Sequence, residues 1–235
     1  MLDLIAFDAD DTLWHNESLY SATQDRLCDL LSPYGQDGRV RAELFQTEMR
    51  NLPDYGYGLK SFGLSMIETA IGLTGGQIKA AEIEQILGLI KGMARTPVRL
   101  LDGVSEAVAA LAATHSLMLI TKGDLLDQER KLAQSGLAAH FSHVEIVSKK
   151  SVDVYRSLLA RYGIAPHRFL MIGNSLRSDV LPVVELGGHA VHIPYHITWA
   201  HESVEGGPHL SDGYVELEQI GLLPSFVETF GREGQ

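Results

Sequence analysis

Short apolar runs alternate with helical patterns along most of this chain. The first run, residues 4–7, is too short for a usual helix and ends abruptly in acidic residues. Similar runs follow at residues 117–120, 144–147, 169–172 and 190–193. Helical spacing of apolar residues lies between them, over about residues 104–113, 125–135, 152–162 and 178–186. Strands that alternate with helices are typical of βαβ units, so the pattern predicts an α/β fold with a Rossmann-like parallel sheet and helices on both faces.

Residues 15–95 carry a different pattern. They contain no convincing strand, and their apolar residues recur at helical spacing, as in Ile83, Ile86 and Ile90. Turn-rich stretches at residues 51–58 and 73–76 would separate the helices. We therefore predict two domains. Residues 1–14 and 96–235 form the α/β core, and residues 15–95 form an all-helical domain inserted after the first strand.

Composition restricts the partners that the protein could have. The 235 residues are 45% hydrophobic, which is enough for a sizeable core. With 19 basic and 30 acidic residues, the net charge of −11 lacks the electrostatic footprint of a nucleic-acid binder. We see no secretory signal and no stretch of the roughly 20 apolar residues that a membrane helix needs. The lone Cys28 permits no intramolecular disulfide. These features predict a soluble cytoplasmic protein that binds neither nucleic acid nor membrane.

Two carboxylates follow the first strand. Ligands of open α/β sheets bind beyond the carboxyl ends of the strands, where Asp8 and Asp10 would lie. Residues two apart in an extended chain point to the same side, so one carboxylate could act as nucleophile and the other as proton donor and acceptor. A solvated acidic turn is the alternative interpretation of this pair taken alone.

Three further strand ends carry polar residues. The Thr121 hydroxyl suits a phosphate oxygen, and a lysine of the pair Lys149–Lys150 could hold a phosphate beside an anionic nucleophile. Asn174 and Asp179 offer an amide oxygen and a carboxylate to a hard cation such as Mg²⁺. Taken singly, these residues equally fit a capping threonine, a solvated lysine pair and a helix start.

Together the four strand ends resemble the motifs of the haloacid dehalogenase superfamily. The D-x-D-x-T signature is matched by residues 8–12, the second-motif threonine by Thr121, the lysine by Lys149–Lys150, and the acidic fourth motif by residues 173–179. Four motifs in the right order are more specific than any one of them. The resemblance implies a Rossmann-like core with Asp8 as nucleophile. It also implies that the helical insert is the family's smaller cap, which closes over small substrates.

The fourth motif departs from the family pattern. It often begins Gly-Asp, whereas this chain has Gly173-Asn174. Whether Asn174 or Asp179 is the direct Mg²⁺ ligand therefore stays open. The catalytic lysine is also open, although we favour Lys150 because only one of two adjacent side chains can face the site.

Members of the superfamily catalyse several reactions, and Asp10 helps to distinguish them. Displacing a halide needs no proton on the leaving group, whereas an alkoxide leaving phosphorus needs one. We therefore predict an Mg²⁺-dependent phosphatase, a hydrolase that acts through an aspartyl-phosphate on Asp8. The resemblance implies that Mg²⁺ is bound by Asp8, the backbone carbonyl of Asp10, and Asn174 or Asp179.

The expected substrate is a small phosphorylated metabolite. Tyr55 and Tyr57, spaced by glycines in the insert, could reach its leaving group or could pack within a turn. A phosphonatase, a dehalogenase, a phosphomutase and a non-catalytic binding protein on the same fold are the alternatives. The sequence leaves the substrate's identity and the oligomeric state open.

Overall fold

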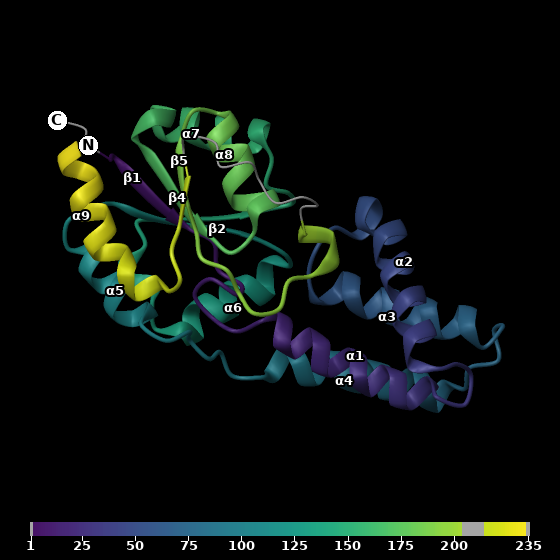
Figure 1. Cartoon of the computed structure of the whole chain (residues 1–235). Helices are drawn as coiled ribbons and strands as arrows, with labels where there is room; N and C mark the ends of the chain where they lie inside the picture. Colours follow the sequence, from purple (N-terminus) through teal and green to yellow (C-terminus); the bar gives the residue numbers. More distant parts are fainter. Residues whose placement is uncertain (1, 204–213, 234–235) are drawn as a thin grey trace. The chain divides into compact units, whose positions relative to one another are not determined.

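Internal contacts divide the chain into two units in this computed structural model, which describes residues 2–203 and 214–233. The α/β unit comprises Met1–Glu17, Val98–Thr121 and Arg130–Gln235, and the helical unit comprises Ser18–Pro97 and Lys122–Glu129 (Figure 1). The segment Lys122–Glu129 packs with the helical unit, although the boundaries expected from sequence placed it in the core. The apolar pattern could not predict this assignment, because the segment is separated in sequence from the insert and joins it through tertiary contacts.

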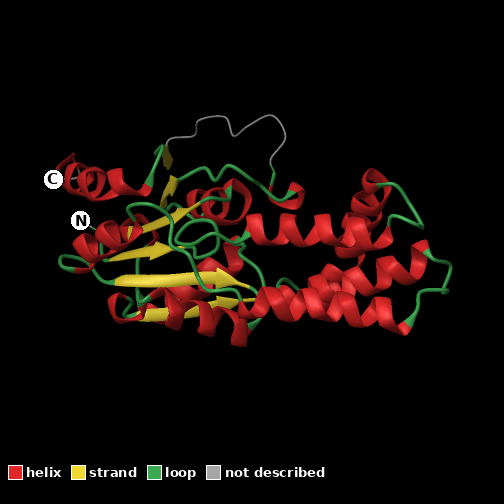
Figure 2. Cartoon of the chain, turned by 90° about the horizontal axis from the view of Figure 1, so that it is seen from below, coloured by secondary structure: helices red, strands yellow, loops and turns green. Residues whose placement is uncertain are grey.

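A six-stranded sheet forms the centre of the α/β unit (Figure 2). Its strands are β1 (Leu4–Phe7), β2 (Leu117–Lys122), β3 (His143–Val147), β4 (Phe169–Gly173), β5 (His189–His192) and β6 (Tyr214–Glu216). The order is β3-β2-β1-β4-β5-β6, and β1 pairs in parallel with both β2 and β4. The predicted Rossmann-like sheet is confirmed. The sixth strand was not predicted, because three residues are too few to show a period.

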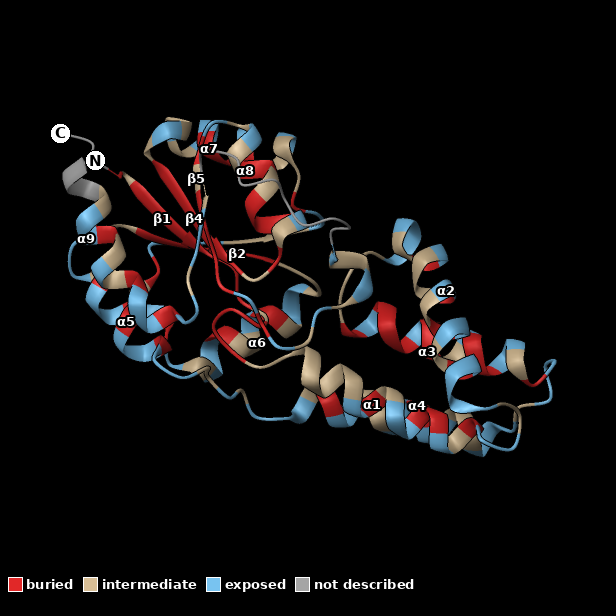
Figure 3. Ribbon diagram, viewed as in Figure 1, coloured by how far each residue is buried: buried red, intermediate tan, exposed pale blue. Residues whose placement is uncertain are grey.

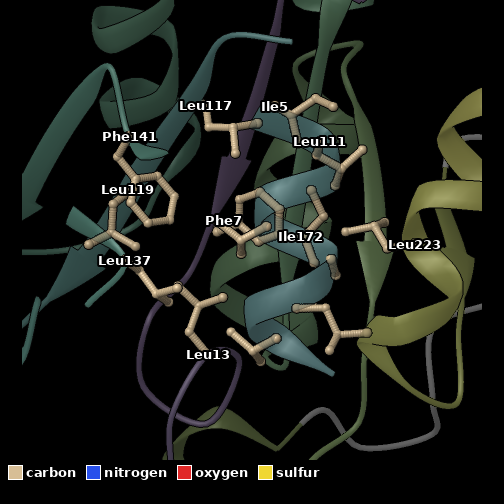
Figure 4. Packing of buried hydrophobic residues seen from close by; sticks show 14 of the residues in the cluster. Ile5, Phe7, Leu13, Leu111, Leu117, Leu119, Leu137, Phe141, Ile172 and Leu223 are labelled. Carbon is tan, nitrogen blue, oxygen red and sulfur yellow. The ribbon is translucent and has the colours of Figure 1, made fainter. Parts of the chain in front are cut away.

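Both faces of the sheet are covered by helices. Along β1, Ile5 and Phe7 belong to one buried cluster while Leu4 and Ala6 belong to another, as alternation along a strand requires. The first cluster includes residues of α5 (Val104–Ala112) and α9 (Leu223–Glu233), and Figure 4 shows its packing around Phe7. The second includes residues of α7 (Val152–Tyr162) and α8 (Leu181–Glu185). The central strands β1, β2 and β4 are accordingly buried along almost their whole length (Figure 3).

The sequence predicted one continuous helix over about residues 178–186, and the structure has two different segments there. A π-helical turn, Leu176–Val180, comes first, and α8 follows from Leu181. Pro182 has no N–H to donate to the carbonyl of Ser178, four residues earlier. The hydroxyl of Tyr155 donates to that carbonyl instead, over 3.0 Å.

The remaining elements of the α/β unit are connections. The helix α6 (Leu125–Ser135) begins in the segment assigned to the helical unit and ends in the α/β unit. Short 3₁₀ turns complete the chain at Ala138–His140, Pro166–Arg168, Ala200–Glu202 and Ile220–Leu222.

Four helices make up most of the helical unit. They are α1 (Glu17–Leu31), α2 (Asp37–Tyr55), α3 (Leu59–Leu73) and α4 (Ala80–Arg95). A separate apolar core joins them, and it includes Leu27, Leu44, Met66 and Ile86 together with the buried Cys28. No strand interrupts residues 15–95, as the helical spacing predicted. None of the described helices combines the length and the hydrophobicity that crossing a membrane requires.

Candidate active site

A tight turn follows β1 and fixes the acidic residues. Asp11 has a φ of 63°, which makes it the only non-glycine among the described residues in the left-handed region. Its carboxylate accepts hydrogen bonds from the backbone N–H groups of Asn16, at 2.8 Å, and Glu17, at 3.0 Å. These are the exposed N–H groups at the start of α1, so Asp11 caps that helix. Burial raises the pKa of Asp11 to about 7, against the opposing effect of the two N–H donors.

Lys150 lies between two carboxylates. Its ammonium is ion-paired with Oδ1 of Asp8 and lies 2.6 Å from Oδ1 of Asp179. The three residues follow β1, β3 and β4, whose carboxyl ends lie at the same edge of the sheet; Asp179 belongs to the π-helical turn Leu176–Val180. Lys150 is buried whereas its neighbour Lys149 is exposed, so the structure brings only one of the two lysines to Asp8.

The charges of this trio shift one another's protonation. Burial raises the pKa of Asp8 to about 7; Lys150 opposes the rise and Asp179 adds to it. Burial alone would lower the pKa of Lys150, but the adjacent carboxylates of Asp179 and Asp8 raise it overall. Lys150 therefore stays protonated and compensates the charge of Asp8.

Thr12 links Asp8 to the loop after β4. The Thr12 hydroxyl lies 3.2 Å from Oδ2 of Asp8 and 3.2 Å from Oδ1 of Asn174, and it accepts the Asn174 N–H over 3.1 Å. The amide oxygen of Asn174 is thus held on the Oδ2 side of Asp8, opposite the contact with Lys150.

Asp179 is fixed by the same loop. It is 1% exposed, and its Oδ2 accepts the N–H of Ser175 over 3.1 Å. A Cβ atom at Gly173 would meet this carboxylate at 2.2 Å, so only glycine leaves space for Asp179 at that point. The glycine that opens the fourth motif is therefore a steric requirement.

The oxygen atoms around Asp8 suit a hard cation. Within residues 2–203 and 214–233, no group of three or more His, Cys, Asp or Glu side chains is placed to hold a metal. Asp8, Asp179 and the Asn174 amide nonetheless supply oxygen donors from adjacent loops. Mg²⁺ commonly uses one or two carboxylates and keeps several waters, so this donor set fits Mg²⁺ better than a metal that needs an all-protein cage.

Asp10 faces different partners. Its Oδ1 accepts the indole N–H of Trp14 over 2.7 Å and lies 3.0 Å from Nζ of Lys131. Lys131, in α6, was not among the residues predicted from sequence. The sequence contains little indication that Lys131 faces the site. Gln128, three residues before Lys131 on α6, is buried, while the apolar Leu125 and Leu126 are exposed. That arrangement reverses what apolar spacing predicts.

The structure places the other predicted site residues as follows. Thr121 is buried at the end of β2, which lies next to β1 in the sheet. Tyr55 and Tyr57 belong to the helical unit. The Tyr55 hydroxyl lies 3.4 Å from Oε1 of Glu68, and Nζ of Lys122 lies 4.2 Å from the ring centre of Tyr57. The expected roles of these three residues in substrate binding stay predictions.

Comparison with known proteins identifies the family. The sequence profile of the haloacid dehalogenase-like hydrolases matches residues 2–187. A crystal structure of a haloacid dehalogenase-like family hydrolase from Xanthomonas campestris is 38% identical, with a TM-score of 0.88 over 99% of this chain and 97% of that one. The chain therefore belongs to the haloacid dehalogenase-like hydrolases, and the resemblance seen in the motifs is confirmed.

Two further similarities are more distant, one to a phosphatase and one to a dehalogenase. A phosphoserine phosphatase of Thermus thermophilus is 34% identical over 97 residues, which are 37% of this chain and 39% of that protein. The match thus spans about two fifths of the length of this curated relative. A 2-haloacid dehalogenase from Pseudomonas syringae pv. tomato has a TM-score of 0.66 at 19% identity, over 98% of this chain and 100% of that one. At that identity the likeness concerns the fold alone.

Proposed function

We propose that this hydrolase is a phosphatase that transfers the phosphoryl group of a small phosphorylated metabolite to Asp8 and then to water. The observation that carries the proposal is the second carboxylate, Asp10. It lies two residues after the nucleophile, outside the Lys150 ion pairs, and is held by the Trp14 and Lys131 donors. A leaving alkoxide needs such an acid, whereas a leaving halide does not.

The first step is the attack of an Asp8 oxygen on phosphorus. The new O–P bond forms as the bond to the leaving oxygen breaks, and Asp10 gives its proton to that oxygen. Lys150, fixed by Asp179, holds the Asp8 carboxylate and compensates charge on the phosphoryl oxygens.

The second step hydrolyses the aspartyl phosphate. Asp10, now a carboxylate, takes a proton from water as the water attacks phosphorus and the Asp8–phosphate bond breaks. Inorganic phosphate leaves, and Asp8 and Asp10 return to their starting forms. The protons and bonds of the two steps balance without any redox partner.

Asp8, the Asp10 carbonyl, and Asn174 or Asp179 are the residues that would hold Mg²⁺. When bound, Mg²⁺ reduces the repulsion between a carboxylate nucleophile and an anionic phosphate. The carboxylates of Asp8 and Asp179 share a single buried cation, Lys150, so a further positive charge suits this site. We therefore also propose that activity depends on Mg²⁺.

Two observations support the choice of substrate class. The partial similarity to a phosphoserine phosphatase favours a small phosphate ester over a haloacid. The net charge of −11 disfavours a nucleic-acid substrate. We infer that the Thr121 hydroxyl binds a phosphate oxygen. Tyr55 and Tyr57 are proposed to contact the leaving group.

The test is product release from a panel of compounds, with Mg²⁺ and with a chelator. The panel holds a nitrophenyl phosphate, sugar phosphates, phosphoserine, a phosphonate and a chlorinated carboxylic acid. We expect metal-dependent phosphate release from the esters and its loss in Asp8→Asn. Asp153→Asn is the matched control, because Asp153 is exposed at the start of α7. Halide release without phosphate release, or full activity in Asp8→Asn, would overturn the proposal.

A further inference from the structure

Lys131 binds the proposed acid although it lies in none of the four motifs. Its Nζ is 3.0 Å from Oδ1 and 3.2 Å from Oδ2 of Asp10, and 2.7 Å from Oδ1 of Asn16. The side chains of Lys131 and Asp10 are only 16% and 22% exposed. Solvent screens a pair at this depth less than it screens a surface pair, so the contact can fix the carboxylate.

Trp14 holds the same carboxylate from another direction. Its indole N–H donates to Oδ1 of Asp10 over 2.7 Å. Trp14 is 1% exposed and packs in the large apolar cluster of the α/β unit, so the donor is rigid. Two donors from separate segments, the loop after β1 and the helix α6, therefore converge on one side chain.

The ammonium of Lys131 contacts both carboxylate oxygens of Asp10. Oδ1 receives both the indole and the shorter ammonium contact, whereas the ammonium is 3.2 Å from Oδ2. We propose that Lys131 is a positioning residue that fixes the carboxyl group of Asp10 for proton transfer to the leaving oxygen. The proposal rests on the phosphatase function proposed above.

Lys131 also affects the energy of the proton transfer. When Asp10 gives its proton to the leaving oxygen, it becomes a carboxylate, and the negative charge forms beside an ammonium and an indole N–H. Donors already in place stabilise such a charge without reorganisation. Lys131 therefore lowers the barrier most when the leaving group needs the proton most.

A purely structural role for Lys131 makes a different prediction. A residue that only joins α6 to the loop would affect all substrates equally. A residue that acts through Asp10 affects esters of weakly acidic alcohols and spares esters of acidic phenols, whose leaving oxygen departs without a proton. The value of kcat/KM reports the steps up to and including the first irreversible one, which is the transfer to Asp8. The dependence of kcat/KM on the leaving group therefore distinguishes the two roles.

The experiment compares Lys131→Met with the wild type on an alkyl phosphate and a nitrophenyl phosphate. We expect kcat/KM to fall about 10- to 100-fold for the alkyl ester and less than about 3-fold for the nitrophenyl ester, since general acids contribute of order 10²- to 10⁴-fold. Lys131→Arg, which keeps the charge, should restore most of the alkyl activity. Arg156→Met, which removes one exposed charge from α7, is the control and should leave both values unchanged.

Equal losses on the two esters, or no loss on either, would overturn the role of Lys131. If the wild type releases phosphate from no ester, the phosphatase function itself fails, which is a distinct outcome. If Lys131→Met does not fold, Asn16→Ala is the second variant, because it removes the 2.7 Å contact to Nζ and leaves Lys131 in place. It should then give a smaller loss with the same difference between the two esters.

Discussion

The ammonium of Lys150 lies 2.6 Å from Oδ1 of Asp179, and both side chains are only 1% exposed. A charge pair at that depth is costly to break, because the remaining partner stays buried without compensation. The same ammonium pairs with Asp8, so one lysine both supports the fold of three loops and holds the proposed nucleophile.

Removing that lysine should destabilise the protein as well as inactivate it. We expect Lys150→Met to lower the free energy of unfolding by about 3–5 kcal/mol, because two buried carboxylates lose their counter-charge. Urea unfolding measures the change. Lys149→Met removes the same charge from the exposed neighbour and should shift stability by less than about 0.5 kcal/mol. Equal stability of the two variants would show that the ion pairs contribute nothing.

Gly58 is a second position where substitution should be costly. It has a φ of 117°, and a Cβ atom there would meet the backbone nitrogen of Asp124 at 2.7 Å. Asp124 also accepts the N–H of Lys60 over 2.8 Å, so it caps α3 from the loop after β2. We expect Gly58→Ala to destabilise the helical unit by about 1–3 kcal/mol in thermal unfolding.

The control for that variant is Gly88, inside α4. A Cβ atom at Gly88 would meet no atom within 4 Å, and the residue is exposed. Gly88→Ala should therefore stabilise the protein by about 0.5–1 kcal/mol, because alanine loses less backbone entropy in a helix. If both variants were destabilised, the close contact with Asp124 would not explain the loss of stability in Gly58→Ala.

Glu48, in α2, should make stability depend on pH. Burial raises the pKa of its carboxyl to about 7, so the folded state favours the protonated form. The resulting stabilisation is complete below the pKa of the unfolded chain and is lost as the pH rises towards about 7. Glu48→Gln removes this loss. It should match the wild type at about pH 4.5 and exceed its stability by roughly 1–2 kcal/mol at about pH 8.

Thermal unfolding at the two pH values measures the Glu48 effect. Glu43→Gln, at an exposed position on the same helix, removes an equal charge and should change stability little at either pH. If Glu48→Gln were no more stable than the wild type at the higher pH, the pH dependence could not be assigned to Glu48.

The sequence could predict most of the α/β core because its signals are local. Each of the first five strands overlaps one of the predicted runs, and the polar residues after the first four runs lie at the same edge of the sheet. Asp8, Lys150 and Asp179 could therefore be proposed as neighbours from their positions in the chain alone. Apolar runs and strand ends can be located in a sequence without knowing how the side chains pack.

The missed features depend on contacts between distant segments. Lys131 reaches Asp10 only because α6 packs beside the loop after β1, and apolar spacing on α6 misleads since Leu125 and Leu126 are exposed. The π-helical turn before Pro182 follows from a missing N–H group four residues after Ser178. Neither feature has a periodic signature.

The most direct test of the central claim is a mass measurement on the enzyme itself. The wild type, turning over a phosphate ester with Mg²⁺, is quenched in acid and its peptides are weighed. The account predicts one added phosphoryl group on the peptide that contains Asp8, and none in Asp8→Asn. Steady phosphate release with an unmodified Asp8 peptide, or release that continues in Asp8→Asn, would contradict an aspartyl-phosphate mechanism.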